Sequence, residues 1–153
     1  MGCRFSGMQP LSKYNRGNRY LLVVVDAFSK YTWVEPIIKS KTGIAVTEAF
    51  KKILKRAQTL ETDDGKEFYN HTFQKLMKDK DIHHFFTTGD TKASMVERFN
   101  RTLKSRMYRY FTSANTYKYL NVLQALVRGY NESFHRSIGM KPSEVTLKNA
   151  SHV

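Results

Sequence analysis

Two segments, each with a carboxylate, contain the residue types best suited to chemistry in this sequence. Asp63 follows an apolar run and lies in the segment TDDGKEF, and Glu97 lies in the basic segment ASMVERFNRTLK. Carboxylate oxygens are the ligands that Mg²⁺ and other hard cations prefer in proteins. An Asp at a strand end and a Glu at a helix start therefore suit a divalent-metal site if the fold brings them together. The alternative is that both are solvated surface charges, as most such pairs are.

A pair of metal ions usually needs a third carboxylate, because two leave much of the ions' charge unneutralised. From spacing alone the candidate set is Asp26, Asp63 and Glu97, since Asp26 also ends an apolar strand. The alternative for Asp26 is structural: an Asp after a strand can fix the next turn through Ser29 or nearby backbone amides.

Other chemistries find little support in the residues. There is no GxSxG elbow and no phosphate-binding loop of the P-loop or dinucleotide type. The five histidines lack zinc-ligand spacing, and the single Cys3 supplies neither a thiolate cluster nor an internal disulfide. His83 and His84 are adjacent in a predicted strand and so point to opposite faces. We expect one to face the core with a hydrogen bond and the other to be solvated.

Composition indicates one globular domain with a polyanionic partner. The chain has 153 residues, among them ten Phe, nine Tyr and one Trp for a core, and a net charge of +13. Such an excess favours nucleic acid over an anionic membrane, the alternative being a basic but merely solvated surface. No apolar run is long enough to span a bilayer, so no membrane partner is expected.

Hydrophobic periodicity predicts nine elements in the order strand, strand, strand, helix, strand, helix, strand, helix, helix. The expected strands are Cys3–Met8, Arg19–Phe28, Tyr31–Ile38, Thr59–Thr62 and Ile82–Thr87. The expected helices are Thr42–Ala57, a short one capped by Asn70, Lys92–Phe111 and Tyr117–Phe134. Pro36 lacks a ladder donor, which favours an edge position for its strand. This order predicts an α/β fold with a mixed sheet of about five strands flanked by helices.

Four ordered motifs resemble the catalytic core of retroviral-type DDE integrases, most closely the integrases of Polinton/Maverick transposons. They are YLLVVVDAFSKYTWVEP, ETDDGKEF, SMVERFNRTLK and YNESFHRSIGMKPSEV, and the similarity runs from about Met8 to Val145. The resemblance implies an RNase H-like fold, two Mg²⁺ or Mn²⁺ ions, and DNA end-processing and strand transfer. It also implies one integrase core-like domain over residues 1–150, whose first strand could be degraded or incomplete. We expect neither the family's zinc-binding module nor its C-terminal DNA-binding module.

The resemblance assigns two of the three family carboxylates. Asp63 matches the Asp of T-D-x-G and Glu97 the Glu of V-E-R-x-N, with 33 residues between them, two fewer than in retroviral members. The first family Asp aligns with Arg4, and residues 1–25 contain no Asp or Glu. Asp26 then corresponds to a family residue that is not a metal ligand. Because an arginine repels Mg²⁺, we expect weak metal binding and little or no strand transfer.

Two kinds of function follow from these residues. In the first, the chain is a metal-dependent DNA strand transferase, with Asp63 and Glu97 holding metal and with Arg98, Arg101 and Lys104 facing the DNA backbone. In the second, it is a non-catalytic, basic nucleic-acid-binding protein or the relic of a decayed transposon. DNA is the expected partner in either case, with homo-oligomers and nuclear residence as further expectations.

Overall fold

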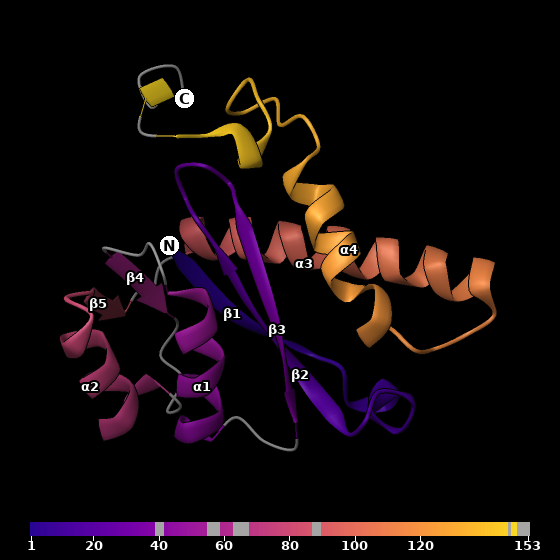
Figure 1. The fold of residues 1–153 in the computed structure, drawn as a ribbon, viewed down its shortest axis with the longest axis horizontal. Helices are drawn as coiled ribbons and strands as arrows, with labels where there is room; N and C mark the ends of the chain where they lie inside the picture. The colour runs from indigo at the N-terminus through magenta and orange to yellow at the C-terminus, as the bar shows by residue number, and fades with distance from the viewer. Residues whose placement is uncertain (39–41, 55–58, 63–67, 87–89, 147, 150–153) are drawn as a thin grey trace.

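A five-stranded mixed sheet forms the centre of the computed structural model (Figure 1). The structure describes residues 1–38, 42–54, 59–62, 68–86, 90–146 and 148–149. The sheet order is β3-β2-β1-β4-β5, with β1, β2 and β3 antiparallel and β4 and β5 parallel to β1. The strands are β1 (Gly2–Gly7), β2 (Asn18–Val25), β3 (Thr32–Ile38), β4 (Thr59–Thr62) and β5 (His83–Phe86). The predicted mixed sheet of about five strands is therefore confirmed.

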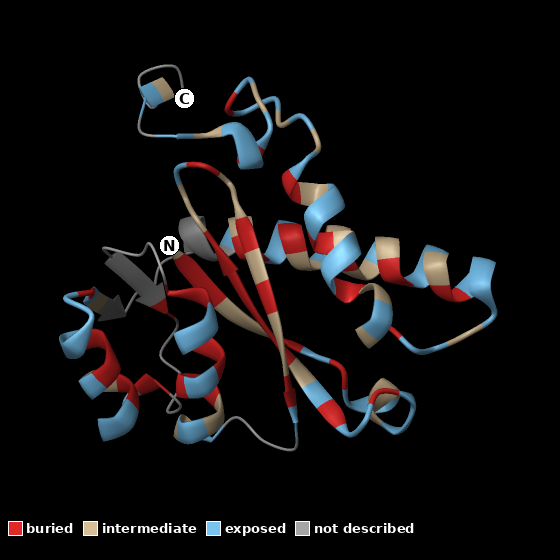
Figure 2. Ribbon diagram, viewed as in Figure 1, coloured by how far each residue is buried: buried red, intermediate tan, exposed pale blue. Residues whose placement is uncertain are grey.

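Two helices cover each face of the sheet, so the strands are buried from both sides (Figure 2). One apolar core joins the sheet to α1 (Gly43–Ile53) and α2 (His71–Asp79). The other joins it to α3 (Asp90–Ala114) and α4 (Leu120–Asn131). All five residues of the run Leu21–Val25 are buried, and alternate residues enter opposite cores, as expected for a central strand. The described residues also form the short 3-10 helices η1 (Gln9–Tyr14) and η3 (Pro142–Glu144).

The first strand, which the sequence suggested could be degraded, is paired along the whole of Gly2–Gly7. All six residues of β1 pair with β2, and Gly2 and Cys3 also pair with β4. The sequence signal was weak because the strand begins and ends in glycine and alternates small or charged residues with Cys3 and Phe5. Gly2 has a packing reason, since a Cβ there would lie 3.3 Å from Val96 Cγ2 of α3. The glycine thus lets α3 cross close over the start of β1.

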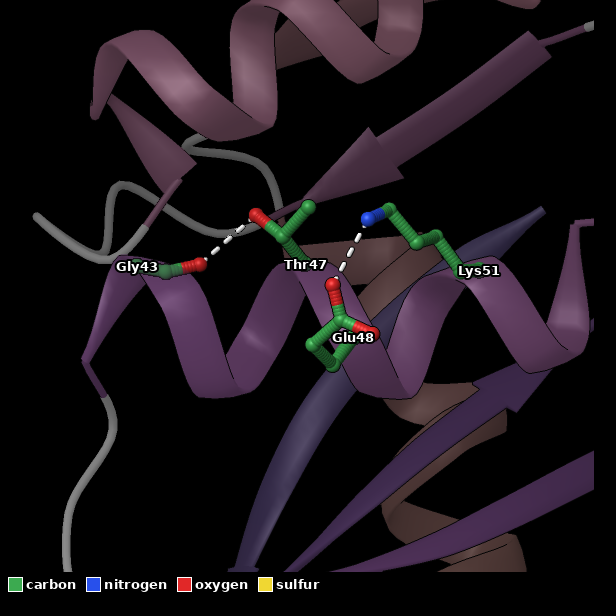
Figure 3. A network of polar contacts seen from close by, with 4 residues as sticks. All are labelled: Gly43, Thr47, Glu48 and Lys51. Atoms are coloured by element: carbon green, nitrogen blue, oxygen red, sulfur yellow. Dashed lines mark hydrogen bonds and ion pairs between the residues drawn. The ribbon is translucent and has the colours of Figure 1, made fainter.

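The predicted cap Asn70 is confirmed, and Thr42, predicted as the first residue of its helix, caps that helix instead. Thr42 caps α1 and Asn70 caps α2, where Asn70 Oδ1 accepts from Phe73 N at 2.9 Å. Figure 3 shows the outer face of α1, where Lys51 Nζ donates to Glu48 Oε1 at 2.6 Å. The helix α1 ends at Ile53, before the predicted Ala57, which lies outside the described residues; α3 is longer than predicted.

The last helix begins three residues later than predicted because its first backbone amides bond elsewhere. The Tyr119 and Leu120 amides donate to Asn15 Oδ1, at 2.7 and 3.3 Å, so helix α4 starts at Leu120 rather than Tyr117. At the other end it stops at Asn131, before the predicted Phe134. No helix among the described residues has the length and apolar character needed to cross a bilayer.

The predicted edge position of β3 is confirmed, and α4 covers that edge. Asn131 Oδ1 accepts from Thr32 N and its Nδ2 donates to Thr32 O, both at 2.9 Å. Two turns earlier, Gln124 Nε2 donates to Val34 O at 2.9 Å. These side chains satisfy strand groups that would otherwise be open to pairing with another chain.

Candidate catalytic site and basic helix

The structure brings Arg4 and Glu97 together at one end of the sheet. Arg4 lies on β1, level with Val23 of β2, and faces α3; Glu97 lies near the start of that helix. The Arg4 guanidinium Nη1 donates to Glu97 Oε1 in an ion pair. The two side chains are 35% and 55% exposed, so solvent screens the pair and its contribution to stability is at most about 1 kcal/mol.

Asp63 lies outside the described residues, so its position relative to Glu97 stays a prediction. The strand that precedes it in sequence is described: β4 ends at Thr62, which pairs with Cys3, the neighbour of Arg4. Thus the sheet places Arg4, rather than an acidic residue, next in β1 after the residue that pairs with Thr62.

The described residues do not fit the metal pair that the resemblance implies. Among them, no three His, Cys, Asp or Glu side chains gather as ligands for a metal ion. One oxygen of Glu97 already accepts from a permanent cation, Arg4. The positive charge of that guanidinium opposes the binding of a divalent cation beside Glu97.

Asp26 has the structural role given above as its alternative. Its Oδ2 accepts from Ser29 Oγ at 2.5 Å and from Ser29 N at 3.2 Å, while its Oδ1 accepts from Phe28 N at 3.4 Å. The carboxylate thus closes the turn between β2 and β3, where Lys30 adopts a left-handed φ of 59°. This corrects the nomination of Asp26 from spacing alone.

A small polar network holds the end of β4 against α2. Gln74 Nε2 donates to Phe68 O at 2.7 Å, and the same amide contacts His84 Nδ1 at 3.1 Å. That ring nitrogen must then accept, so His84 Nε2 donates to Thr62 Oγ1 at 3.0 Å. Burial lowers the pKa of His84, and the neighbouring His83 lowers it further. His84 is half-buried and His83 is exposed, so the prediction of one core-facing, hydrogen-bonded histidine and one solvated histidine is confirmed.

The predicted DNA-contacting residues lie on α3, but on two different faces of it. By helical periodicity Arg101 and Lys104 share a stripe with Glu97 and Tyr108, whereas Arg98 lies about 100° round the helix. No acidic side chain among the described residues pairs with Arg98, Arg101 or Lys104. Arg106 differs, because its Nη1 donates to Leu126 O of α4 at 3.4 Å and its guanidinium lies over the Tyr130 ring. Burial raises the pKa of Tyr130, while Arg106 and Arg98 act in the opposite direction.

Sequence reasoning missed an asparagine that joins two distant segments. Asn15 is 1% exposed, and its Nδ2 donates to Leu11 O at 2.8 Å and to Tyr117 O at 2.9 Å. Together with the bonds that its Oδ1 accepts from the start of α4, these contacts tie η1 to the α3–α4 connection. A lone Asn in a turn-rich segment gives no local signal of partners about a hundred positions away.

Comparison with known proteins agrees with this architecture. A family model described as "Integrase core domain" matches residues 10–90. A transposon-derived protein of Caenorhabditis elegans is 40% identical over 142 residues, which cover 90% of this chain and 49% of that protein. The chain thus spans about half the length of this curated relative. The resemblance to Polinton/Maverick integrases stays a prediction.

Two solved structures share the fold at low sequence identity. The catalytic core domain of BIV integrase matches with a TM-score of 0.75 and 20% identity, over 98% of this chain and 94% of that one. A chain of the simian T-cell lymphotropic virus intasome matches with a TM-score of 0.81 and 19% identity, over 94% of this chain and 52% of that one. Integrase catalytic cores have an RNase H-like fold, so this fold class is established for the chain.

Proposed function

Because the chain belongs to the integrase core domain family, we propose that it is a transposon-derived integrase core that binds DNA with little or no strand-transfer activity. The observation on which this depends is the ion pair between Arg4 and Glu97. Arg4 takes the place of the first family carboxylate, and its positive charge pairs with the third, Glu97. A site with a guanidinium in place of a ligand holds less negative charge and offers fewer oxygens to Mg²⁺ or Mn²⁺.

Restoring the carboxylate tests the proposed cause of inactivity. We expect Arg4→Asp to raise affinity for Mn²⁺ severalfold, because it removes a cation and adds an oxygen ligand while freeing Glu97. Binding is measured by Mn²⁺ titration followed by electron paramagnetic resonance, which needs no enzymatic turnover. Arg4→Asn is the matched control, because it removes the cation without adding a carboxylate, and it should give a smaller rise.

The absence of turnover is tested with the unaltered chain. A Mg²⁺- or Mn²⁺-dependent nicking and joining assay on duplex DNA should give no product above background. Glu97→Gln controls for contaminating nucleases, because a contaminant would be unaffected by it. Activity in the unaltered chain that Glu97→Gln abolishes would refute the non-catalytic proposal and favour the strand transferase.

The proposed duplex-DNA contact is the basic stripe of α3, formed by Arg101 and Lys104, with Arg98 beside it. Its support is that these cations have no acidic partner among the described residues, within a chain of net charge +13. Phosphate contact predicts that the logarithm of the affinity falls linearly with the logarithm of salt concentration, by about 0.9 per contact. A salt-independent interaction would contradict this part of the proposal.

The whole-protein context stays within the same proposal. The chain covers 49% of its transposon-derived relative and 52% of the matched intasome chain. We infer assembly into a homo-oligomer and action in the nucleus from the family. Gel filtration combined with light scattering, with and without duplex DNA, tests the oligomer directly. A monomer under both conditions would argue against intasome-like assembly of this chain by itself.

A further inference from the structure

An exposed group of tyrosines lies at the far end of α3 from Glu97. Tyr14, Tyr108 and Tyr117 are 40%, 59% and 53% exposed. Tyr14 of η1 packs on Tyr117 of the α3–α4 connection with ring centroids 5.2 Å apart. With Lys13, whose Nζ lies 4.9 Å from the centre of the Tyr14 ring, these residues are called the tyrosine surface.

The tyrosine surface continues the stripe that contains Glu97. Tyr108 lies on this stripe, about 16 Å from Glu97 along the helix axis at 1.5 Å per residue. The ring centroids of Tyr108 and Phe111 are 5.8 Å apart, and those of Phe111 and Tyr117 are also 5.8 Å apart. Ring contacts therefore run from Tyr108 of α3 through Phe111 and Tyr117 to Tyr14.

Charge is segregated on this side of the molecule. The segments that build it, residues 1–25 and 98–131, contain eleven Lys and Arg and no Asp or Glu. Their elements pack together: β2 contacts both β1 and η1, and α3 packs on β1, β2 and α4. All thirteen acidic residues lie in the rest of the chain. These segments therefore attract a polyanion, and the carboxylate of Glu97, which lies beside them on α3, is paired with Arg4.

The backbone next to the rings of Tyr14 and Tyr117 is fixed by hydrogen bonds of Asn15. Asn15 follows Tyr14 in sequence, and its buried amide bonds Tyr117 O at 2.9 Å and Tyr119 N at 2.7 Å. This clamp fixes the backbone next to both rings, so little conformational freedom remains to be lost on binding. Tyr117 also covers Phe111, whereas the Tyr14 ring packs on Tyr117 and lies beneath Lys13.

We propose that the tyrosine surface binds single-stranded DNA. Its bases stack on Tyr14, Tyr108 and Tyr117, and its phosphates lie near Lys13 and the neighbouring Lys and Arg side chains. Exposed aromatic rings interleaved with Lys and Arg are the chemistry by which proteins hold single strands without base specificity. A duplex offers phosphates but keeps its bases stacked on each other, so rings favour an unpaired strand. The inference extends the proposed DNA binding to a second surface and a different form of DNA.

Substitution of the rings tests the proposal by fluorescence anisotropy with a labelled single-stranded oligonucleotide and, in parallel, a duplex. Tyr14→Ala and Tyr117→Ala should each weaken single-strand binding at least about fivefold, and Tyr14→Phe and Tyr117→Phe should preserve it. Duplex affinity should change less than twofold. Tyr69→Ala is the matched control, because Tyr69 is also 53% exposed and belongs to neither η1, α3 nor the connection.

A cross-linking measurement keeps the test decisive if an alanine variant unfolds. The unaltered chain is irradiated with a single-stranded oligonucleotide containing 5-bromodeoxyuridine, and the adducts are mapped by mass spectrometry. Adducts on Tyr14, Tyr108 or Tyr117 support the proposal. Adducts only elsewhere, or alanine variants that bind the single strand as tightly as the unaltered chain, would overturn it. Duplex binding that is absent from the start would instead refute the proposed function and leave single-strand binding to stand or fall separately.

Discussion

The two helical layers bury the sheet equally well but treat their surface charge in opposite ways. On the side of α1, lysines have acidic neighbours: Lys51 pairs with Glu48 at 2.6 Å (Figure 3). Lys52 pairs with Glu35 of β3 at 3.4 Å. On the side of α3, Arg101 and Lys104 have no such partner among the described residues, and the pairing there joins Arg4 to Glu97. Since burial does not require this difference, it points to a partner for the α3 side.

The largest expected effect is on stability and compares two asparagines, Asn15 on the α3 side and Asn70 on the α1 side. Asn15→Ala should lower the free energy of unfolding by about 3 kcal/mol, since it leaves several buried backbone groups without their hydrogen-bond partner. Asn70→Ala on the other side removes a helix cap and should cost about 1 kcal/mol. Urea denaturation of both variants measures the difference. Equal losses would mean that the clamp at Asn15 stabilises no more than an ordinary cap.

The second effect concerns DNA and uses matched pairs of cations. Arg101→Gln with Lys104→Gln should reduce the slope of log affinity for duplex DNA against log salt by about 2, because each contact releases about one counterion. Lys51→Gln with Lys52→Gln removes the same charge from the α1 side and should leave the slope unchanged. The measurement is a salt titration by fluorescence anisotropy. If both pairs lower the slope equally, the attraction comes from net charge and no binding face exists.

Local sequence patterns predicted most of the fold because they report on interactions between near neighbours. The cap Asn70, the strand predicted within Arg19–Phe28 and the edge marked by Pro36 all lie where they were expected. Motif alignment assigned Arg4 to the position of a family carboxylate, but it did not predict the ion pair with Glu97, since no local pattern relates residues 93 positions apart.

The tyrosine surface could not be predicted, since it depends on contacts between η1 and the α3–α4 connection. Asn15 bonds residues 102 and 104 positions away, and neither Tyr14 nor Tyr117 belongs to a periodic stripe. The same contacts explain why α4 starts late. Periodicity cannot show that the amides before a helix are satisfied from another part of the chain.

A smaller effect is expected at a buried hydroxyl in the core on the α3 side. Tyr119 is fully buried, and its hydroxyl oxygen has no hydrogen-bond partner among the described residues. Burial raises the pKa of Tyr119 to about 12. Tyr119→Phe should therefore raise the free energy of unfolding by about 1 kcal/mol, because it removes an unsatisfied polar group and keeps the ring. Thermal or urea unfolding tests this, and a loss of stability would show that the hydroxyl has a partner.

The smallest effect separates the two sides by pH rather than by salt. His84 belongs to the α2 side, and burial lowers its pKa below the ordinary 6.5, with a further contribution from His83. The unfolded chain therefore binds more protons than the folded chain as pH falls through 6.5, so stability is full above that pH and declines below it until the lowered pKa is passed. Protonation also removes the acceptor that His84 Nδ1 offers to Gln74. Urea denaturation between pH 7.5 and 5 should show this decline (chosen to bracket about 6.5), and His84→Gln should flatten it while His83→Gln should leave most of it. An undiminished decline in His84→Gln would assign the pH dependence to another group, with His135 next, since burial and the nearby Lys30 and Arg106 also lower its pKa.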